Sequence, residues 1–218
     1  MDAIDNFYRT DKKSSASGLI SEENKHLIIM CGLPGSGKTS IANVIKNNFP
    51  NSVILNRFAF FSRFLNHQIR ISRTSLVALV DELFYAKAEE LLTKHALLIF
   101  DGTYHTRCKR ERAYKFAKDN KLSITIIRCL CDNSQILQRL RRQVKKGSKR
   151  FIGCDPHQLI RKYREEFEEI EPYEEFHYYF IYNTSSHDCT FQPRVLASDY
   201  PKHILKVKTI LSVFRRPF

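Results

Sequence analysis

The segment GLPGSGKT, residues 32–39, constrains the fold of this chain more than any other feature. It matches the pattern G-x-x-x-x-G-K-[ST], with the apolar run LIIMC before it and an amphipathic segment, residues 38–49, after it. Glycines at this spacing let the backbone turn back with its N–H groups directed inward, at a helix start where anions bind. The segment therefore predicts a phosphate-binding loop between a buried strand and a helix.

The residue types in this loop predict binding of ATP and Mg²⁺. The Lys38 ammonium places a positive charge near the β- and γ-phosphates, and the Thr39 hydroxyl is a ligand for Mg²⁺. Asp101 ends the apolar run ALLIFD, where a carboxylate beside the loop holds the metal or its water shell. The alternative for Asp101 is an N-cap of the next helix. The predicted nucleotide-binding residues are Gly32, Gly35, Ser36, Gly37, Lys38, Thr39 and Ser40.

Five apolar runs of strand length, nearly continuous rather than alternating, are separated by helical patterns. They occupy residues 27–32, 52–56, 96–102, 123–130 and 177–183. This alternation predicts an α/β three-layer sandwich, with a parallel five-stranded sheet covered by helices on both faces. In the helix expected over residues 75–95, one face should be apolar. That face carries Leu76, Leu79, Val80, Leu83 and Ala86.

The chain divides into three predicted parts: a polar N-terminal arm (1–25), a nucleotide-binding domain (26–185) and a C-terminal extension (186–218) with a basic amphipathic helix. Its start lacks the apolar core of a signal peptide, and no apolar run is long enough to span a bilayer. Six cysteines without a CxxC or zinc-binding spacing indicate free thiols in a reducing compartment and no zinc site. We expect a soluble, cytoplasmic protein.

Positive charge is concentrated in one part of the chain. Residues 107–150 hold fifteen Lys or Arg and three acidic residues, which accounts for most of the net charge of +13. Within them Arg139 and Arg142 lie one turn apart on a predicted helix, followed by the basic run KKGSKR. This pattern suits a lid that closes over ATP and stabilises charge on the transferring phosphoryl group, or else a solvated helix face. The excess charge indicates an anionic partner: nucleic acid, a nucleotide, a phosphorylated metabolite or a membrane surface.

Taken in order, these motifs resemble the P-loop kinases of the polynucleotide 5′-hydroxyl kinase and zeta-toxin type, and are also similar to seryl-tRNA kinases. The resemblance covers residues 26–185 and includes CGLPGSGKT, ILNRFAFFSR, FDGTYHTRCKRERAYKFAK and ILQRLRRQVKKGSKR. It implies an ATP- and Mg²⁺-dependent kinase with an arginine-rich lid, whose best-fitting acceptor is the 5′-hydroxyl end of a nucleic acid. The implied catalytic residues are Lys38, Asp101, Arg139 and Arg142, and the implied acceptor-binding residues are Arg57, Arg63 and Thr103.

One position departs from the resembled pattern. Polynucleotide kinases carry an aspartate after the second strand that takes the proton from the attacking hydroxyl, and here Phe58 stands in its place. No Asp or Glu occurs from residue 53 to residue 80. A general base must reach the hydroxyl that it activates, so either Asp101 doubles as the base, or Asp81 or Glu82 reaches in from the next helix. A third explanation is a protein that binds nucleotide without the usual transfer.

Two other functions therefore stay open. One is a kinase of another acceptor, such as an aminoacyl-tRNA, a nucleotide sugar or a small molecule. The other is a degenerate kinase that acts as a nucleotide- or RNA-binding module. The aromatic residues that follow the second strand, Phe58, Phe60, Phe61 and Phe64, either stack against a base or cover an acceptor, or they pack in the core.

Overall fold

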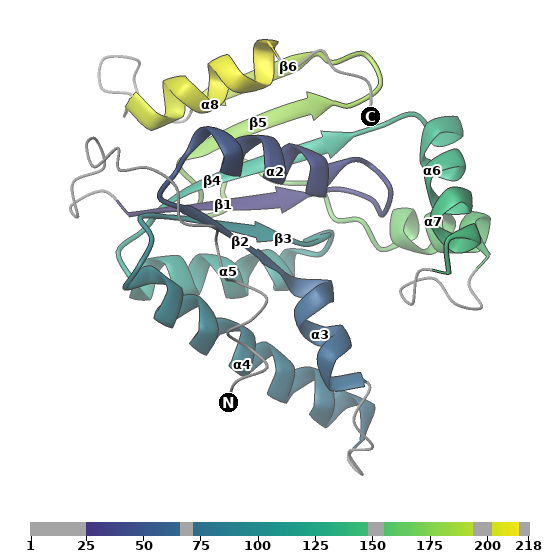
Figure 1. Cartoon of the computed structure of the whole chain (residues 1–218), viewed down its shortest axis with the longest axis horizontal. Coiled ribbons are helices and arrows are strands. Elements are labelled where there is room, and N and C mark those ends of the chain that lie inside the picture. The colour runs from purple at the N-terminus through teal and green to yellow at the C-terminus, as the bar shows by residue number, and fades with distance from the viewer. Residues whose placement is uncertain (1–24, 66–71, 148–154, 194–201, 214–218) are drawn as a thin grey trace.

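The computed structural model describes residues 25–65, 72–147, 155–193 and 202–213. Its central feature is a six-stranded sheet with strand order β2-β3-β1-β4-β5-β6 (Figure 1). The strands are β1 (His26–Cys31), β2 (Ser52–Asn56), β3 (Leu97–Asp101), β4 (Ser123–Leu130), β5 (Tyr178–Asn183) and β6 (Cys189–Pro193). The first five are parallel, which confirms the predicted α/β sheet. The sixth, not predicted, pairs antiparallel with β5 and extends the sheet by one strand.

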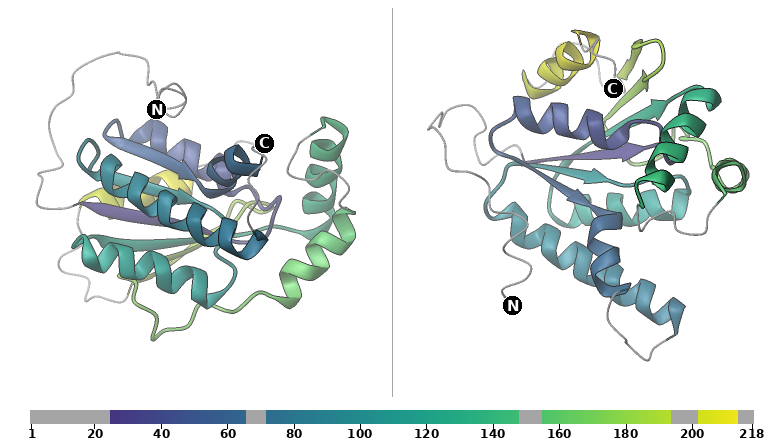
Figure 2. Two further views of the ribbon diagram at one scale, coloured as in Figure 1. Left: turned by 90° about the horizontal axis from the view of Figure 1, so that it is seen from below. Right: turned by 45° about the vertical axis from the view of Figure 1, so that its right-hand side comes forward.

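Helices cover both faces of the sheet, as the near-continuous apolar strands predict. They are α2 (Lys38–Asn48), α3 (Arg57–Leu65), α4 (Arg73–Leu92), α5 (Arg107–Asp119), α6 (Asn133–Lys145), α7 (Pro156–Glu165) and α8 (Lys202–Val213). Helices α2 and α8 pack on one face, and α4 and α5 pack on the other (Figures 1 and 2). Helices α6 and α7 lie beyond the carboxyl ends of the strands. This edge of the sheet is where α/β folds bind ligands.

The chain enters a helix directly after β2. Helix α3 begins at Arg57, and the Asn56 side chain accepts a hydrogen bond from the backbone N–H of Ala59 at 2.7 Å. An asparagine that caps the first turn in this way satisfies a backbone donor that the helix leaves unpaired. This hydrogen bond fixes the start of α3 to the end of β2.

The apolar face predicted for α4 is correct only in part. Val80 is buried and Leu76 packs against the core as predicted, but Leu79 and Leu83 are 40% and 38% exposed, and Phe84 and Ala88 are buried instead. The Phe84 ring packs 5.1 Å from the Phe100 ring in β3, and so this aromatic side chain sets the orientation of the helix. Apolar residues occur all around α4, and their spacing alone does not select the buried side.

Several predicted segments lie outside the described residues. Lys25 is the one described residue of the N-terminal arm, and the basic run after α6 continues into residues 148–154, which are not described. The segment predicted as a C-terminal extension contributes β6 and α8, and α8 packs against α2 through Ile204, Val207 and Leu211. Within the described ranges, no helix combines the length and apolar character needed to cross a membrane.

Candidate nucleotide and acceptor site

The phosphate-binding loop joins β1 to α2 at the carboxyl edge of the sheet. Gly37 is the N-cap of α2, with a φ of 90°, and no side chain caps this helix start or adds an acidic group to its first turn. Unpaired backbone N–H groups and the helix dipole both favour an anion at such a position. The loop therefore has the geometry of a phosphate cradle.

Gly32 shows why this loop needs glycine. Its φ is +138°, and a Cβ built there would lie 2.5 Å from the carbonyl oxygen of Cys129 in β4. A side chain at this position would force the loop away from the neighbouring strand. The pattern of glycines in the sequence thus reflects a loop that packs tightly on β4.

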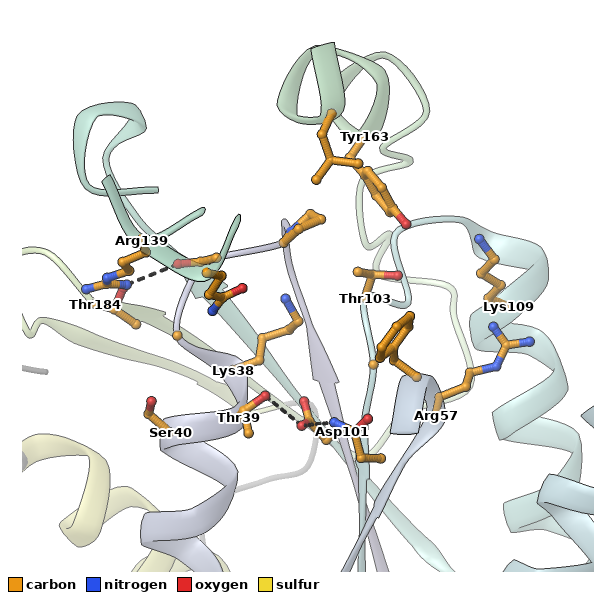
Figure 3. Close-up of a pocket in the computed structure, with 18 of the residues that line it drawn as sticks. Lys38, Thr39, Ser40, Arg57, Asp101, Thr103, Lys109, Arg139, Tyr163 and Thr184 are labelled. Carbon is orange, nitrogen blue, oxygen red and sulfur yellow. Dashed lines mark hydrogen bonds between the residues drawn. The ribbon is translucent and has the colours of Figure 1, made fainter. Parts of the chain in front are cut away.

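Lys38 folds back over the loop. It is 6% exposed, and its Nζ donates a hydrogen bond to the backbone oxygen of Leu33 at 2.6 Å. The Ser36 hydroxyl lies 3.4 Å from the same nitrogen. Figure 3 shows Lys38 pointing into the cavity above the loop. Its ammonium group is therefore positioned at the mouth of the cradle, where a phosphate would accept its hydrogen bonds.

Thr39 and Asp101 meet beside the cradle. The Thr39 hydroxyl donates to Asp101 Oδ2 at 2.7 Å, and the Asn56 amide donates to the same oxygen at 2.6 Å (Figure 3). A hydroxyl and a carboxylate are the oxygen ligands that Mg²⁺ prefers, so the donor set fits this metal. The alternative role of Asp101 as a helix N-cap is wrong, because α5 begins six residues later with Thr106 as its N-cap.

Arg139 lies behind the loop. Its Nη1 donates to the Gly35 carbonyl oxygen at 3.2 Å and to Thr184 Oγ1 at 3.3 Å, and Nη2 donates to Gln135 Oε1. Thr184 in turn donates to the backbone oxygen of Ser36 at 3.0 Å. These contacts tie α6 and the end of β5 to the cradle. Arg142, one turn further along α6, is exposed and lines the cavity, as a lid residue would.

The cradle opens into a cavity of about 1490 Å³. On the side opposite α6, its wall carries Arg57 from α3, Asp81 from α4, and Lys109 and Arg112 from α5. Apolar groups, Phe58 and Val77 among them, lie beside these charges. Thr103 lines the same wall, and Figure 3 shows it facing the cavity near Arg57 and Lys109. The side chain of Arg63 lies outside what the structure describes.

Asp81 is the carboxylate that α4 brings into this wall. Its two oxygens are held by Arg57 and by Arg112, the latter at 2.6 Å, and the side chain is 7% exposed. Burial acts to lower the pKa of Arg57, but the charge and hydrogen bond of Asp81, together with Tyr104 and Tyr85 nearby, raise that pKa above its ordinary value. Glu82, the other carboxylate considered for this helix, is exposed and does not line the cavity.

Four side chains of this site were not predicted from the sequence: Lys109, Arg112 and Tyr163, which line the cavity, and His105, which is buried beside Thr103. Lys109 and Arg112 belong to an evenly basic segment, which gave no signal to separate them from solvated neighbours. Burial, and then the charge of Arg57, lowers the pKa of Lys109. Tyr163 comes from α7 and lies on the cavity side in Figure 3.

The fold and the loop together define a P-loop kinase of the class that the sequence motifs resemble. The family model described as AAA domain (AAA_33) matches residues 27–168, and the chain belongs to this family. The chain is 27% identical over 165 residues to 6-phosphofructo-2-kinase/fructose-2,6-bisphosphatase 1 of Rattus norvegicus, a match that covers 68% of this chain and 34% of that protein. It thus spans about a third of the length of the curated relatives it matches.

Two solved structures show the same fold. A putative kinase from Chloroflexus aurantiacus has a TM-score of 0.59 at 18% identity, over 86% of this chain and 97% of that one. A chain of the Pnkp1/Rnl/Hen1 RNA repair complex has a TM-score of 0.52 at 18% identity, over 71% of this chain and 49% of that one.

Proposed function

We propose that this protein is an ATP- and Mg²⁺-dependent kinase that transfers the γ-phosphoryl group to a hydroxyl of a phosphorylated acceptor. We call the wall formed by Arg57, Asp81, Lys109 and Arg112 the acceptor wall. One observation carries the proposal: the Thr39–Asp101 pair and Lys38 face the three cations of this wall across one cavity. Phosphoryl transfer needs chiefly position and electrostatic stabilisation, and this arrangement supplies both. Bound Mg²⁺ would neutralise phosphate charge between Thr39 and Asp101.

The acceptor wall supports an acceptor that carries its own phosphate. Arg57, Lys109 and Arg112 are contributed by two different helices, and Asp81 holds the two arginines in place. Guanidinium groups fixed in this way bind phosphate with little loss of side-chain entropy. Phe58 and Val77 add an apolar surface beside them, on which a planar or sugar group can pack.

We propose the 5′-hydroxyl end of a nucleic acid as the acceptor. The basic side chains Arg142, Lys146 and Lys162 continue from the cavity lining and would follow a phosphate backbone. The structural similarity to a chain of an RNA repair complex agrees with this choice. A phosphorylated sugar is the second candidate, since the curated relatives are named as 6-phosphofructo-2-kinases.

Transfer of label from γ-labelled ATP tests the proposal and separates the acceptors. The protein is incubated with Mg²⁺ and, in parallel, with a 5′-hydroxyl oligoribonucleotide, with tRNA, with nucleotide sugars and with hexose monophosphates. We expect label on the oligonucleotide, its loss in Lys38→Ala, and its retention in Lys46→Ala, which changes a lysine at the far end of α2.

An increase in acceptor KM of about tenfold or more is expected for Arg57→Ala, because a charge-assisted hydrogen bond contributes about 1.5–3 kcal/mol. The matched control is Arg161→Ala, on the exposed side of α7. Label found only on a hexose monophosphate would show that the acceptor is a phosphorylated sugar, the second candidate. Binding of ATP without label on any acceptor would instead assign a nucleotide-binding module.

A further inference from the structure

Three side chains connect the acceptor side of the cavity with the protein surface. Thr103 lines the cavity, and its Oγ1 lies 3.0 Å from Nδ1 of His105. Nε2 of His105 lies 3.2 Å from Oε2 of Glu166. The His105 side chain is 2% exposed and the Glu166 side chain is 45% exposed. A buried imidazole thus lies between a hydroxyl in the cavity and a carboxylate in contact with water.

A strained turn at Tyr104 brings the side chains of Thr103 and His105 into contact. Tyr104, between them, has a φ of +43° and a buried ring. A non-glycine residue in this region costs about 1–3 kcal/mol and is common at functional sites. The Thr103 carbonyl accepts a hydrogen bond from Gly32 N at 3.0 Å, and the His105 carbonyl accepts one from Glu168 N at 2.8 Å. The turn is therefore fixed to the phosphate-binding loop on one side and to the segment after α7 on the other.

Burial and the charge of Lys109 favour the neutral form of His105. Lys109 Nζ lies 3.3 Å from Nε2, the Tyr163 ring packs 4.6 Å away, and the nearby charges are Lys109, Glu166 and Lys38. Burial, followed by the charge of Lys109, lowers the pKa of His105 to about 4, although Glu166 acts in the opposite direction. A neutral imidazole holds one proton. The Glu166 carboxylate favours that proton on Nε2, which leaves the Nδ1 lone pair free to accept from Thr103.

Among the residues that the structure describes, two carboxylates line the cavity, and both are already engaged. Asp81 is held between two guanidinium groups, and Oδ2 of Asp101 accepts hydrogen bonds from Thr39 and Asn56. With Phe58 in the position of the aspartate, another route is needed for the proton of the acceptor hydroxyl. The hydroxyl–imidazole–carboxylate line is such a route, and its arrangement is that of a general-base system.

We propose that Thr103, His105 and Glu166 form a proton relay for the acceptor hydroxyl, which replaces the missing aspartate. As the acceptor oxygen bonds to the γ-phosphorus, the bond from that phosphorus to the bridging oxygen breaks and its electron pair leaves with ADP. The acceptor proton passes to Thr103 Oγ, the Thr103 proton passes to His105 Nδ1, and the Nε2 proton passes to Glu166 and then to water. Thr103 is the catalytic residue, and His105 and Glu166 are positioning residues that act through it.

This relay rests on the proposed kinase function, so its test needs one readout that does not depend on transfer. The first readout is steady-state transfer from γ-labelled ATP to the 5′-hydroxyl oligoribonucleotide, or to a hexose monophosphate if the protein prefers that acceptor. We expect kcat to fall about 10²-fold in His105→Asn with little change in acceptor KM, since general acid–base catalysis contributes about 10²–10⁴-fold. Thr103→Val should lose kcat to a similar extent, and Thr103→Ser should restore it.

Glu166→Gln and Glu165→Gln form a matched pair of exposed glutamates. Glu165 pairs with Arg161, away from His105. We expect a lower kcat in Glu166→Gln alone, with the acidic limb of the pH–rate profile moved to lower pH because the carboxylate that raises the pKa of His105 is gone. Equal kcat values and profiles in the two variants, or a His105→Asn variant with wild-type kcat, would exclude the relay. Label retained on the protein at Thr103 would also exclude it, because Thr103 would then be the acceptor.

The second readout is NMR of the imidazole nitrogens in the wild-type protein. We expect His105 to titrate well below its ordinary range with the proton on Nε2, and its pKa to fall further in Glu166→Gln but not in Glu165→Gln. A proton on Nδ1, donated to Thr103 while Lys109 donates to Nε2, would refute the relay even if no acceptor is ever found. Conversely, the expected tautomer in a protein that transfers to no acceptor would refute the kinase function and not the hydrogen-bonded line.

Discussion

Arg110 and Glu174 form a buried ion pair across 64 residues of chain. Both guanidinium contacts to the carboxylate, from Nε and from Nη2, measure 2.7 Å, and the two side chains are 0% and 1% exposed. Arg110 also donates to the backbone oxygens of Tyr104, Glu168 and Glu169. This pair therefore fixes the turn after β3 to the segment between α7 and β5, on which the acceptor wall depends.

Glu174→Gln should lower the free energy of unfolding by about 3–5 kcal/mol, because it leaves a buried arginine charge without its partner. Burial alone would raise the pKa of Glu174, but hydrogen bonds from Arg110 and Tyr114 lower it below its ordinary value. The stabilisation is therefore complete above the unfolded-state pKa of about 4.3 and is lost as the pH falls through the lower folded-state pKa. Urea unfolding at several pH values measures the contribution of Glu174 to the free energy of unfolding. The difference in free energy of unfolding between Glu174→Gln and the wild type should narrow in acid. Glu175→Gln, which changes an exposed neighbour, should unfold with the same free energy as the wild type at every pH.

Asp101→Asn should remove the Mg²⁺ dependence of ATP binding. The wild-type affinity for ATP should fall about tenfold or more when EDTA replaces Mg²⁺, since loss of an oxygen ligand or its support costs about 10–100-fold. Calorimetry with and without the metal compares the two proteins. Asp119→Asn, on the exposed side of α5, serves as the control. An unchanged response to Mg²⁺ in Asp101→Asn would place the metal elsewhere.

Phe58→Asp should raise transfer to a 5′-hydroxyl oligonucleotide by about tenfold or more, because a carboxylate would again lie in the cavity wall. Phe58→Asn is the matched control, since it removes the ring without adding a base. In the His105→Asn background the gain should be larger, as the new carboxylate would replace the relay. An equal effect of Asp and Asn would show that the ring, and not the missing base, limits this activity.

Gly32→Ala should destabilise the protein and weaken ATP binding, because the new Cβ meets the Cys129 carbonyl oxygen at 2.5 Å. Gly147→Ala is a close control: Gly147 also has a positive φ, +69°, but a Cβ added there would meet nothing within 4 Å. An alanine bears backbone strain of about 1–3 kcal/mol in the αL conformation of Gly147, and more at Gly32, whose φ of +138° lies outside the αL range. Thermal unfolding and ATP titration should therefore show a larger loss for Gly32→Ala, through this strain and the contact together, and similar losses in both variants would contradict this prediction.

The five parallel strands and the phosphate-binding loop were predictable because each rests on a local pattern. A run such as LIIMC is apolar without alternation, and the following glycines have no other common use before a helix. The Asp155–Pro156 start of α7 is equally local, and the Asp155 side chain accepts from the backbone N–H groups of His157 and Gln158. These elements are set by residues close together in the sequence, so tertiary contacts were not needed to predict them.

The acceptor wall was not predictable in the same way. Lys109 and Arg112 differ from other basic residues of α5 only by the side of the helix that faces Arg57 and Asp81, which tertiary packing decides. His105 acquires its partner Glu166 from a segment 61 residues away. The phase of α4 depends on the Phe84 ring meeting Phe100. Each of these depends on contacts between distant segments, which a single sequence does not encode in any spacing.

The bond from Thr184 Oγ1 to the Ser36 carbonyl has a consequence for how the protein is made. The two residues are 148 positions apart, and Arg139 and the end of β4 join the same contact. During translation, the phosphate-binding loop therefore leaves the ribosome well before the threonine that braces it. A nascent chain that has not yet reached Thr184 carries the loop without this support.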